Sequence, residues 1–139
     1  MKMKRIEFNK PIYTYEIDAS QHVSNIAYIQ WMEICRVKLV DEVGLPIHEM
    51  NKKGFVPALV RTEIDYKKPL SMGDEVTVVM WLSELGSSSA KMSFEFYNQQ
   101  NNIVATGEQV GLFISLESQR PHKLSDHDRK RFEPYLASQ

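Results

Sequence analysis

The sequence predicts an α+β fold in which one curled antiparallel sheet of five strands wraps around one long helix. Three observations support this prediction. A strand-like segment is followed by a long apolar helix and then by four further strand-like segments. The links between these four are short and rich in turn residues, which favours antiparallel neighbours. Apolar residues occur on nearly all sides of the helix, so the sheet must curl to cover it.

The N-terminal part supplies the first strand and the long helix. Arg5–Ile17 is rich in strand-forming residues, and Pro11 within it indicates a bulge or an edge strand. Asn25–Val43 predicts a helix of about five turns. Gly44 and Pro46 follow it as a stop signal. The residues that define its apolar face at helical spacing are Tyr28, Trp31, Met32, Cys35, Leu39 and Val43.

The C-terminal part supplies the other strands and a last helix. A short helix or loop is expected at residues 47–54, and strands are expected within residues 55–70, 74–85, 90–99 and 103–117. Apolar residues on the outer face of the sheet predict self-association. A C-terminal helix is predicted after Ser125, its N-cap, and Pro134 limits its length. We expect residues 1–139 to form a single domain.

Charge and cysteine content exclude several functional classes. The chain has 17 basic and 18 acidic residues and a formal net charge of −1, which gives no bias toward nucleic acid or membranes. Its one cysteine, Cys35, allows no internal disulfide, and no Cys/His spacing suits a metal. Neither a signal peptide nor a membrane-spanning run is visible. We therefore expect a cytoplasmic protein without metal or cofactor that binds neither nucleic acid nor membranes.

A surplus of polar residues stands directly before the long helix. Residues 18–25 read DASQHVSN, and a helix start needs only one cap, which Ser24 or Asn25 can supply. Asp18 is then left without a capping role. His22 either orients a site or satisfies a loop hydrogen bond. Because the first turn of a helix presents unpaired N–H groups and partial positive charge, Asp18 and this helix end could face one reactive carbonyl.

These residues resemble a known signature. The pattern ID-x-x-QHV-x-N-x-x-Y-x-x-x-x-E-x-x-R resembles that of hotdog-fold thioesterases of the 4-hydroxybenzoyl-CoA thioesterase type, most closely the long-chain acyl-CoA branch. The matching residues are Asp18, Gln21, His22, Val23, Asn25, Tyr28, Glu33 and Arg36. A second match, in the family's order, consists of Tyr66, Pro69, Gly73 and Asp74. Many relatives carry Gly at the position of Gln21 and Asn at that of Ser24.

The resemblance implies a hotdog fold and hydrolysis of acyl-CoA thioesters, with acyl carrier protein as an alternative thiol carrier. Asp18 matches the family's catalytic carboxylate, which attacks the thioester carbonyl or activates water. Asn25 stands where the family uses a backbone N–H to polarise that carbonyl. His22 is a third catalytic candidate. The resemblance also implies a homodimer or homotetramer with active sites at subunit interfaces.

Several residues are candidates for substrate contact or for structural roles. Tyr28 either lines an acyl tunnel or belongs to the core. Glu33 and Arg36 lie three residues apart on the helix, which predicts a structural ion pair. Cys35 lies on the buried stripe, which predicts an inert thiol. The basic residues that either bind CoA phosphates or form a solvated edge are Arg61, Lys67 and Lys68.

Two other functions stay open at this point. A hotdog-type hydratase or dehydratase pairs a His with an acidic residue, and His22 and Glu33 are the nearby pair, although they lie on different segments. A non-catalytic acyl-CoA-binding protein can share the same fold. The presence of Asp18 at the matching position favours catalysis over this binding function, and the Gly/Pro-rich approach to the His that is typical of hydratases is absent.

Overall fold

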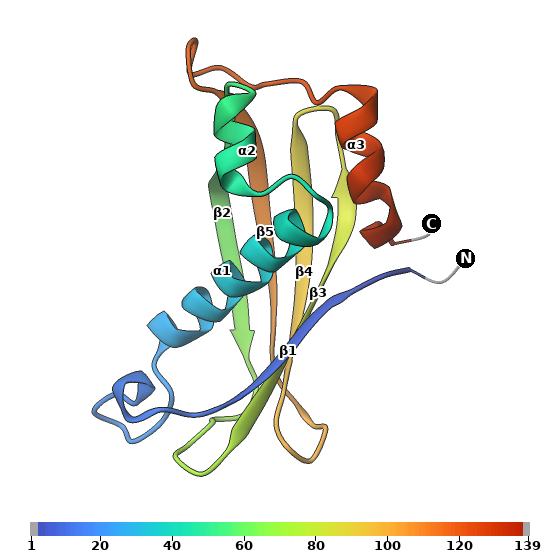
Figure 1. The fold of residues 1–139 in the computed structure, drawn as a ribbon. Coiled ribbons are helices and arrows are strands. Elements are labelled where there is room, and N and C mark those ends of the chain that lie inside the picture. The colour runs from blue at the N-terminus through green and yellow to red at the C-terminus, as the bar shows by residue number, and fades with distance from the viewer. Residues whose placement is uncertain (1–2, 138–139) are drawn as a thin grey trace.

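The computed structural model describes residues 3–137 and contains one antiparallel sheet. The strand order is β1-β3-β4-β5-β2, and all neighbours run antiparallel. Helix α1 (Asn25–Glu42) lies across the concave face of this sheet (Figure 1). The predicted α+β fold is therefore confirmed. The strands are β1 (Ile6–Pro11), β2 (Phe55–Tyr66), β3 (Glu75–Leu85), β4 (Ser89–Tyr97) and β5 (Ile103–Ser115).

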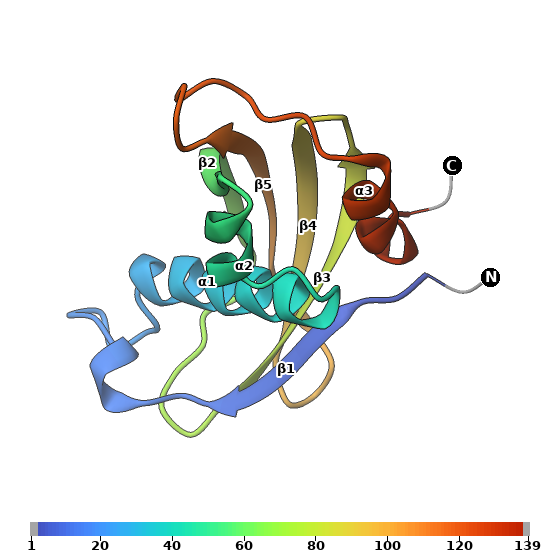
Figure 2. The same cartoon turned by 45° about the horizontal axis from the view of Figure 1, so that its top comes forward.

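Two shorter helices lie at the end of the sheet away from the start of α1 (Figure 2). Helix α2 (Ile47–Lys52) packs against β2, and α3 (Asp126–Phe132) lies beside β3 (Figure 1). The hydroxyl of Ser125 accepts a hydrogen bond from the N–H of Asp128, which confirms the predicted N-cap. A 3-10 turn, η2 (Glu133–Tyr135), follows α3.

The core lies between α1 and the concave face of the sheet. Met32 and Cys35 of α1 are fully buried there, together with Phe96 of β4. Burying a Met or Phe side chain stabilises the fold by about 1.5–3 kcal/mol. The helix approaches closely at Gly107, where an added Cβ would lie 2.5 Å from the Cε atom of Met32. A side chain at this position of β5 would therefore displace the end of the Met32 side chain.

The first strand is shorter than the sequence predicted. The strand expected over Arg5–Ile17 ends at Pro11, and the chain then forms a 3-10 turn, η1 (Thr14–Glu16). Proline fixes φ and lacks the N–H that would continue the ladder. The prediction of an edge position was right, because β1 pairs only with β3 on one side.

The sequence predicted that α1 is covered on nearly all sides, and this prediction is wrong for the single chain. Four apolar residues lie exposed along it, with relative exposures of 39–68%. The sequence shows that these four residues are apolar, but it does not show which part of the structure, if any, covers them. On the outer face of the sheet, the apolar Trp81 lines a groove together with mostly polar residues, called here the polar groove. The exposed residues of α1 are Ile26, Ile29, Ile34 and Val37, and the polar groove includes Glu63, Ser93, Glu95, Thr106 and Glu108.

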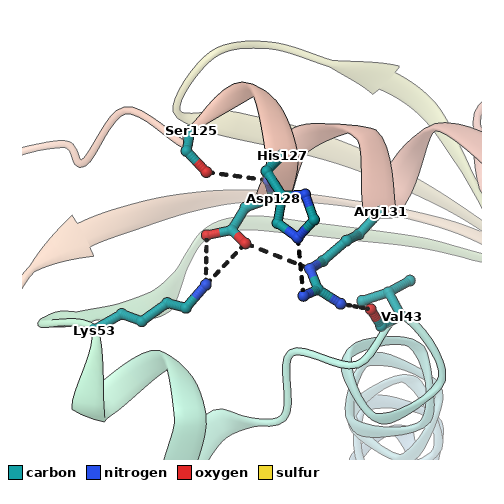
Figure 3. Close-up of polar contacts among 6 residues, drawn as sticks. All are labelled: Val43, Lys53, Ser125, His127, Asp128 and Arg131. Atoms are coloured by element: carbon teal, nitrogen blue, oxygen red, sulfur yellow. Dashed lines mark hydrogen bonds and ion pairs between the residues drawn. The ribbon is translucent and has the colours of Figure 1, made fainter.

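A polar cluster, shown in Figure 3, fastens α3 to the rest of the fold. The carboxylate of Asp128 is 4% exposed and accepts hydrogen bonds from Lys53 Nζ at 3.0 and 3.2 Å. It also pairs with Arg131 Nε at 3.4 Å. Arg131 Nη1 donates to the carbonyl of Val43 at 2.9 Å. The cluster thus ties α3 to the end of α2 and to the end of α1.

Replacing Asp128 with Ala should lower the free energy of unfolding by about 1–3 kcal/mol, because Lys53 and Arg131 lose a buried carboxylate. Asp126→Ala, in the exposed first turn of the same helix, is the matched control and should change it by about 0.5 kcal/mol or less. Urea denaturation measures both variants. Equal midpoints for the two would contradict the role of the cluster.

Candidate active site

A polar pocket of about 300 Å³ lies at the N-terminal end of α1. It brings together six of the seven site residues that the sequence predicted. The seventh, Arg61, lies elsewhere on β2 and pairs with Glu63 at 2.9 Å. The predicted basic cluster is therefore divided. The residues that line the pocket are Asp18, Ser20, His22, Val23, Asn25, Tyr28, Tyr66, Lys67, Lys68 and Pro69.

A tight loop holds Asp18 at this pocket. Ile17 and Val23 form an isolated antiparallel bridge at its base. Inside the loop, the N–H of Asp18 donates to the carbonyl of His22 at 2.9 Å, and the N–H of Gln21 donates to the carbonyl of Asp18 at 3.0 Å. Gln21 has a φ of +69°, in the left-handed region that favours glycine. A Gly at this position would adopt the same angle without strain.

The carboxylate of Asp18 is exposed and ionised. Its Oδ1 atom accepts hydrogen bonds from the hydroxyl of Ser20 at 2.5 Å and from the backbone N–H of Ser20 at 2.9 Å. These two bonds hold the pKa of Asp18 below its ordinary value. The Oδ2 atom has no hydrogen-bond partner among residues 3–137. One charged oxygen is therefore available to a ligand at neutral pH.

The start of α1 has no side-chain cap. Ser24 occupies the N-cap position with extended backbone angles, but its hydroxyl makes no capping hydrogen bond. The first N–H groups of a helix have no acceptor within the helix and carry partial positive charge. Asn25 is the first residue of this turn and lines the pocket. The pocket therefore combines a carboxylate with backbone donors suited to a developing oxyanion.

A buried carboxylate that the sequence did not single out anchors the loop. Glu16 is 4% exposed and accepts hydrogen bonds from Trp31 Nε1 at 2.8 Å, from Tyr13 N at 2.8 Å and from Lys10 Nζ at 2.5 Å. Its carbonyl accepts from the N–H of Ser24 at 2.8 Å. Burial disfavours the charge, but these donors outweigh it, so the pKa of Glu16 lies below its ordinary value.

An aromatic cluster forms the inner wall of the pocket. Tyr28 is 2% exposed, and its ring lies 5.1 Å from that of Tyr66 and 5.2 Å from that of Phe96. Burial raises the pKa of Tyr28 to about 12, so its hydroxyl stays protonated. Tyr28 therefore belongs to the core and lines the pocket at the same time.

Other candidates from the sequence lie outside the pocket. Cys35 is buried, and burial raises its pKa to about 12, which fits the predicted inert thiol. Glu33 and Arg36 form the predicted pair at 3.7 Å, and Arg36 Nη1 also donates to Gln109 Oε1 at 2.7 Å. Since Glu33 does not line the pocket that holds His22, the pair required for a hydratase is not assembled.

Residues 3–137 provide neither a group of metal ligands nor a helix suited to crossing a membrane. No three His, Cys, Asp or Glu side chains lie close enough together there to hold a metal ion. In the same part of the chain, no helix has the length and apolar character needed to cross a membrane.

The family is established by comparison with known proteins. A family model described as the thioesterase-like superfamily matches residues 12–132. The chain belongs to this superfamily. The resemblance drawn from the two sequence motifs is thereby confirmed. Among superfamily relatives, a Bacillus subtilis (strain 168) protein named "Putative acyl-CoA thioesterase YneP" is 27% identical over 106 residues, covering 76% of this chain and 77% of the relative.

Further relatives agree on family and fold. The long-chain acyl-CoA thioesterase FadM of Escherichia coli (strain K12) is 23% identical over 120 residues, covering 86% of this chain and 90% of FadM. A Staphylococcus aureus protein solved in complex with CoA superposes with a TM-score of 0.89 at 15% identity, covering 97% and 85% of the two chains. The DHNA-CoA thioesterase of the same organism gives 0.83 at 19% identity, covering 94% and 88%. The predicted hotdog fold is confirmed.

Replacing Glu16 with Gln should lower the free energy of unfolding by about 1–3 kcal/mol at pH 7. Because the folded pKa lies below the ordinary value of 4.5, this contribution is complete above pH 4.5 and is lost as the pH falls through the folded pKa. Urea denaturation at several pH values should therefore show that the free energies of unfolding of wild type and variant converge at acid pH. The exposed Glu7→Gln is the control, and a gap independent of pH would contradict this account.

Proposed function

We propose that the protein hydrolyses acyl-CoA thioesters to a carboxylic acid and free CoA. The observation that carries the proposal is the polar pocket, where the Asp18 carboxylate and the uncapped start of α1 line one space. Relatives named as acyl-CoA thioesterases support this choice of substrate. The fold of a protein solved with CoA bound supports it too.

The proposed mechanism uses both sides of the pocket. The thioester oxygen lies at the first-turn amides of α1, at Asn25, which stabilise the negative charge of the tetrahedral intermediate. Asp18 either attacks the carbonyl carbon or takes a proton from the water that attacks it. The C–S bond then breaks, and the thiolate of CoA leaves and takes up a proton from water or from protonated Asp18. Where Asp18 is the nucleophile, water then hydrolyses the acyl–Asp18 anhydride, which releases the carboxylic acid and restores the carboxylate. The lowered pKa of Asp18 keeps it charged at neutral pH for either role. His22 lies on the same pocket and orients the water or the substrate.

The loop after β2 is the proposed contact for the CoA phosphates. The backbone N–H groups of Lys67 and Lys68 both donate to the carbonyl of Val104, at 2.8 and 3.1 Å, which fixes this loop. Neither ammonium group forms an ion pair within residues 3–137. Arg61 has Glu63 as its partner and is the weaker candidate. Acyl carrier protein remains the alternative thiol carrier, and comparing both carriers in one assay distinguishes them.

A homodimer through β2 is the proposed assembly. β2 is an edge strand of 12 residues whose outer side offers unpaired backbone groups. Its middle carries two exposed apolar residues, Leu59 at 40% and Val60 at 56%. Antiparallel pairing with β2 of a second copy satisfies these backbone groups. The same interface would also cover the exposed apolar residues of α1. A homotetramer would need a second interface. Its molecular mass in solution distinguishes it from the homodimer.

The alternatives are weaker on specific grounds. A hydratase needs an acid beside His22, and Glu33 lies outside that pocket. A non-catalytic acyl-CoA-binding protein has no use for an ionised Asp18 held by Ser20. We also propose a cytoplasmic location, since the one cysteine, Cys35, is a free thiol, which suits a reducing compartment.

Asp18→Asn should lower kcat for acyl-CoA hydrolysis by roughly 10²–10⁴-fold, because the amide can neither attack nor accept the proton. The matched control is Asp41→Asn, an exposed carboxylate near the other end of the same helix, which should leave kcat unchanged. Both are assayed by thiol release from a panel of acyl-CoAs, with thermal unfolding to verify the fold. Undiminished turnover of Asp18→Asn would reject the catalytic role.

Val60→Arg should weaken the dimer about tenfold or more. In a pairing centred on the middle of β2, residue 60 of each copy lies opposite Arg61 of the other, so the new charge meets a like charge. Sedimentation velocity over a dilution series measures the change. Gln100→Arg, on the exposed β4–β5 turn, adds the same charge away from β2. If both variants retain the wild-type mass distribution, the interface lies elsewhere.

A further inference from the structure

The Asp18 carboxylate is held by Ser20, the second residue after it. Oδ1 of Asp18 accepts hydrogen bonds from the Ser20 hydroxyl at 2.5 Å and from the Ser20 N–H at 2.9 Å. Both residues line the polar pocket. The bond from the N–H two positions along the chain is the turn that Asp residues commonly form. The bond from the hydroxyl is an addition to that turn, and the side chain at position 20 supplies it.

The backbone of the loop keeps its shape without the Ser20 side chain. The N–H of Asp18 donates to the carbonyl of His22 at 2.9 Å, and the N–H of Gln21 donates to the carbonyl of Asp18 at 3.0 Å. Neither bond involves Ser20. A substitution at position 20 therefore removes the hydroxyl donor and leaves the backbone N–H of that residue beside the carboxylate.

The side-chain partner of Asp18 is a neutral hydroxyl, although three basic side chains line the same pocket. Within residues 3–137, none of the three forms an ion pair or a side-chain hydrogen bond with Asp18. An ammonium group would neutralise the carboxylate, as Lys10 does for Glu16. A hydroxyl fixes the orientation of the carboxylate and leaves it its full negative charge. The three basic residues are His22, Lys67 and Lys68.

Two donors on the same oxygen select one orientation of the carboxylate. The last torsion of an Asp side chain has a broad energy minimum, so an exposed carboxylate turns easily unless it is held. With both Ser20 donors on Oδ1, the Oδ2 atom keeps no hydrogen-bond partner within residues 3–137. Orientation matters for reaction, because a misplacement of about 1 Å can cost about 10²-fold in rate.

We propose that Ser20 is a positioning residue for hydrolysis, whose hydroxyl holds Oδ1 of Asp18 so that Oδ2 attacks the thioester carbonyl or takes the proton from water. This inference rests on the proposed thioesterase function. Ser20 acts through Asp18 and forms no bond to the substrate. Its hydroxyl also favours the charged carboxylate and is the largest cause that holds the pKa of Asp18 below its ordinary value.

Loss of the hydroxyl has two consequences that can be separated. The pKa of Asp18 rises toward its ordinary value, so the acid limb of the profile of kcat/KM against pH moves to higher pH. A more basic carboxylate would react faster at neutral pH, where it is already charged. A slower reaction at neutral pH therefore reports lost orientation and not a changed basicity.

The other titratable groups of the pocket come from its loop, from α1 and from the end of β2. Burial raises the pKa values of the two tyrosines, which therefore stay neutral in acid. Lysine ammonium groups keep their charge at acid pH. An imidazole gains a proton as the pH falls, so His22 also contributes to the profile. These groups are His22, Tyr28, Tyr66, Lys67 and Lys68.

Ser20→Val and Ser20→Thr form the decisive pair, because the two side chains have the same shape and only Thr keeps a hydroxyl. In Ser20→Val, kcat at neutral pH should fall about tenfold with KM within about threefold, and the acid limb should move to higher pH. Ser20→Thr should keep the acid limb and stay within about threefold in kcat. Thiol release from acetyl-, butyryl-, myristoyl- and benzoyl-CoA measures turnover, and thermal unfolding verifies the fold.

Two further variants complete the kinetic test. Ser20→Ala removes the hydroxyl without a branched side chain and should behave as Ser20→Val if branching disturbs the turn. Ser71→Ala is the matched control, since the hydroxyl of Ser71 forms no hydrogen bond within residues 3–137. It should leave both kcat and the acid limb unchanged.

A titration followed by NMR measures Asp18 without turnover. The carboxyl carbon of Asp18 is observed in protein labelled with ¹³C in aspartate, and Asp18→Asn identifies its signal. The midpoint should lie at higher pH in Ser20→Val than in wild type or Ser20→Thr. The same order should hold in a His22→Gln background, which removes the imidazole.

The outcomes separate this inference from the function on which it rests. An active wild type overturns the role of Ser20 and leaves the thioesterase function standing if kcat and the acid limb are unchanged in Ser20→Val and Ser20→Ala. The role is also overturned if kcat falls equally in Ser20→Val and Ser20→Thr with the acid limb unmoved, because the hydroxyl is then irrelevant. A wild type that hydrolyses none of the four acyl-CoAs removes the proposed function, and the positioning role with it.

Discussion

The contact of α1 with the middle of the concave face divides the space along this helix. The Met32 side chain of α1 reaches the sheet at Gly107, where β5 carries no side chain. On one side of this contact the start of α1 reaches the polar pocket, and on the other side its second half borders a largely apolar cavity of about 440 Å³, called here the apolar cavity. A close-packed interior transmits any change at this contact to both spaces.

Two carboxylates placed two residues apart perform different tasks because their surroundings differ. Glu16 is buried among Lys10, Tyr13 and Trp31 and fixes the loop to the core. Asp18 is exposed and bonded only through one oxygen to Ser20. Both pKa values lie below their ordinary range, but the first carboxylate is saturated with donors and the second keeps an oxygen free. The rigid anchor gives the exposed group a defined position.

Local sequence patterns were sufficient for most of the fold. The bounds of α1 followed from its periodicity and the Gly44 stop signal, and the Asp18 cluster before it led to the pocket. The role of Glu16 was not predictable, because its partner Trp31 is 15 residues away and is reached only after folding. The exposed apolar residues of α1 were misjudged for a related reason. An apolar side chain is stabilised when it is removed from water. Either its own chain or a second chain can cover it, and the sequence does not distinguish the two.

The attachment of α3 has a consequence for how such a protein can diversify. Phe132 of α3 forms part of the wall of the apolar cavity, and Asp128 holds that helix in place through Lys53 and Arg131. The loop that carries Asp18 lies more than a hundred residues earlier in the chain, and within residues 3–137 it shares no side-chain hydrogen bond with this cluster. The loop that carries Asp18 and the contacts that hold α3 are thus encoded in separate stretches of sequence. Substitutions at Phe132 can therefore reshape one wall of the cavity and leave the surroundings of Asp18 as they are.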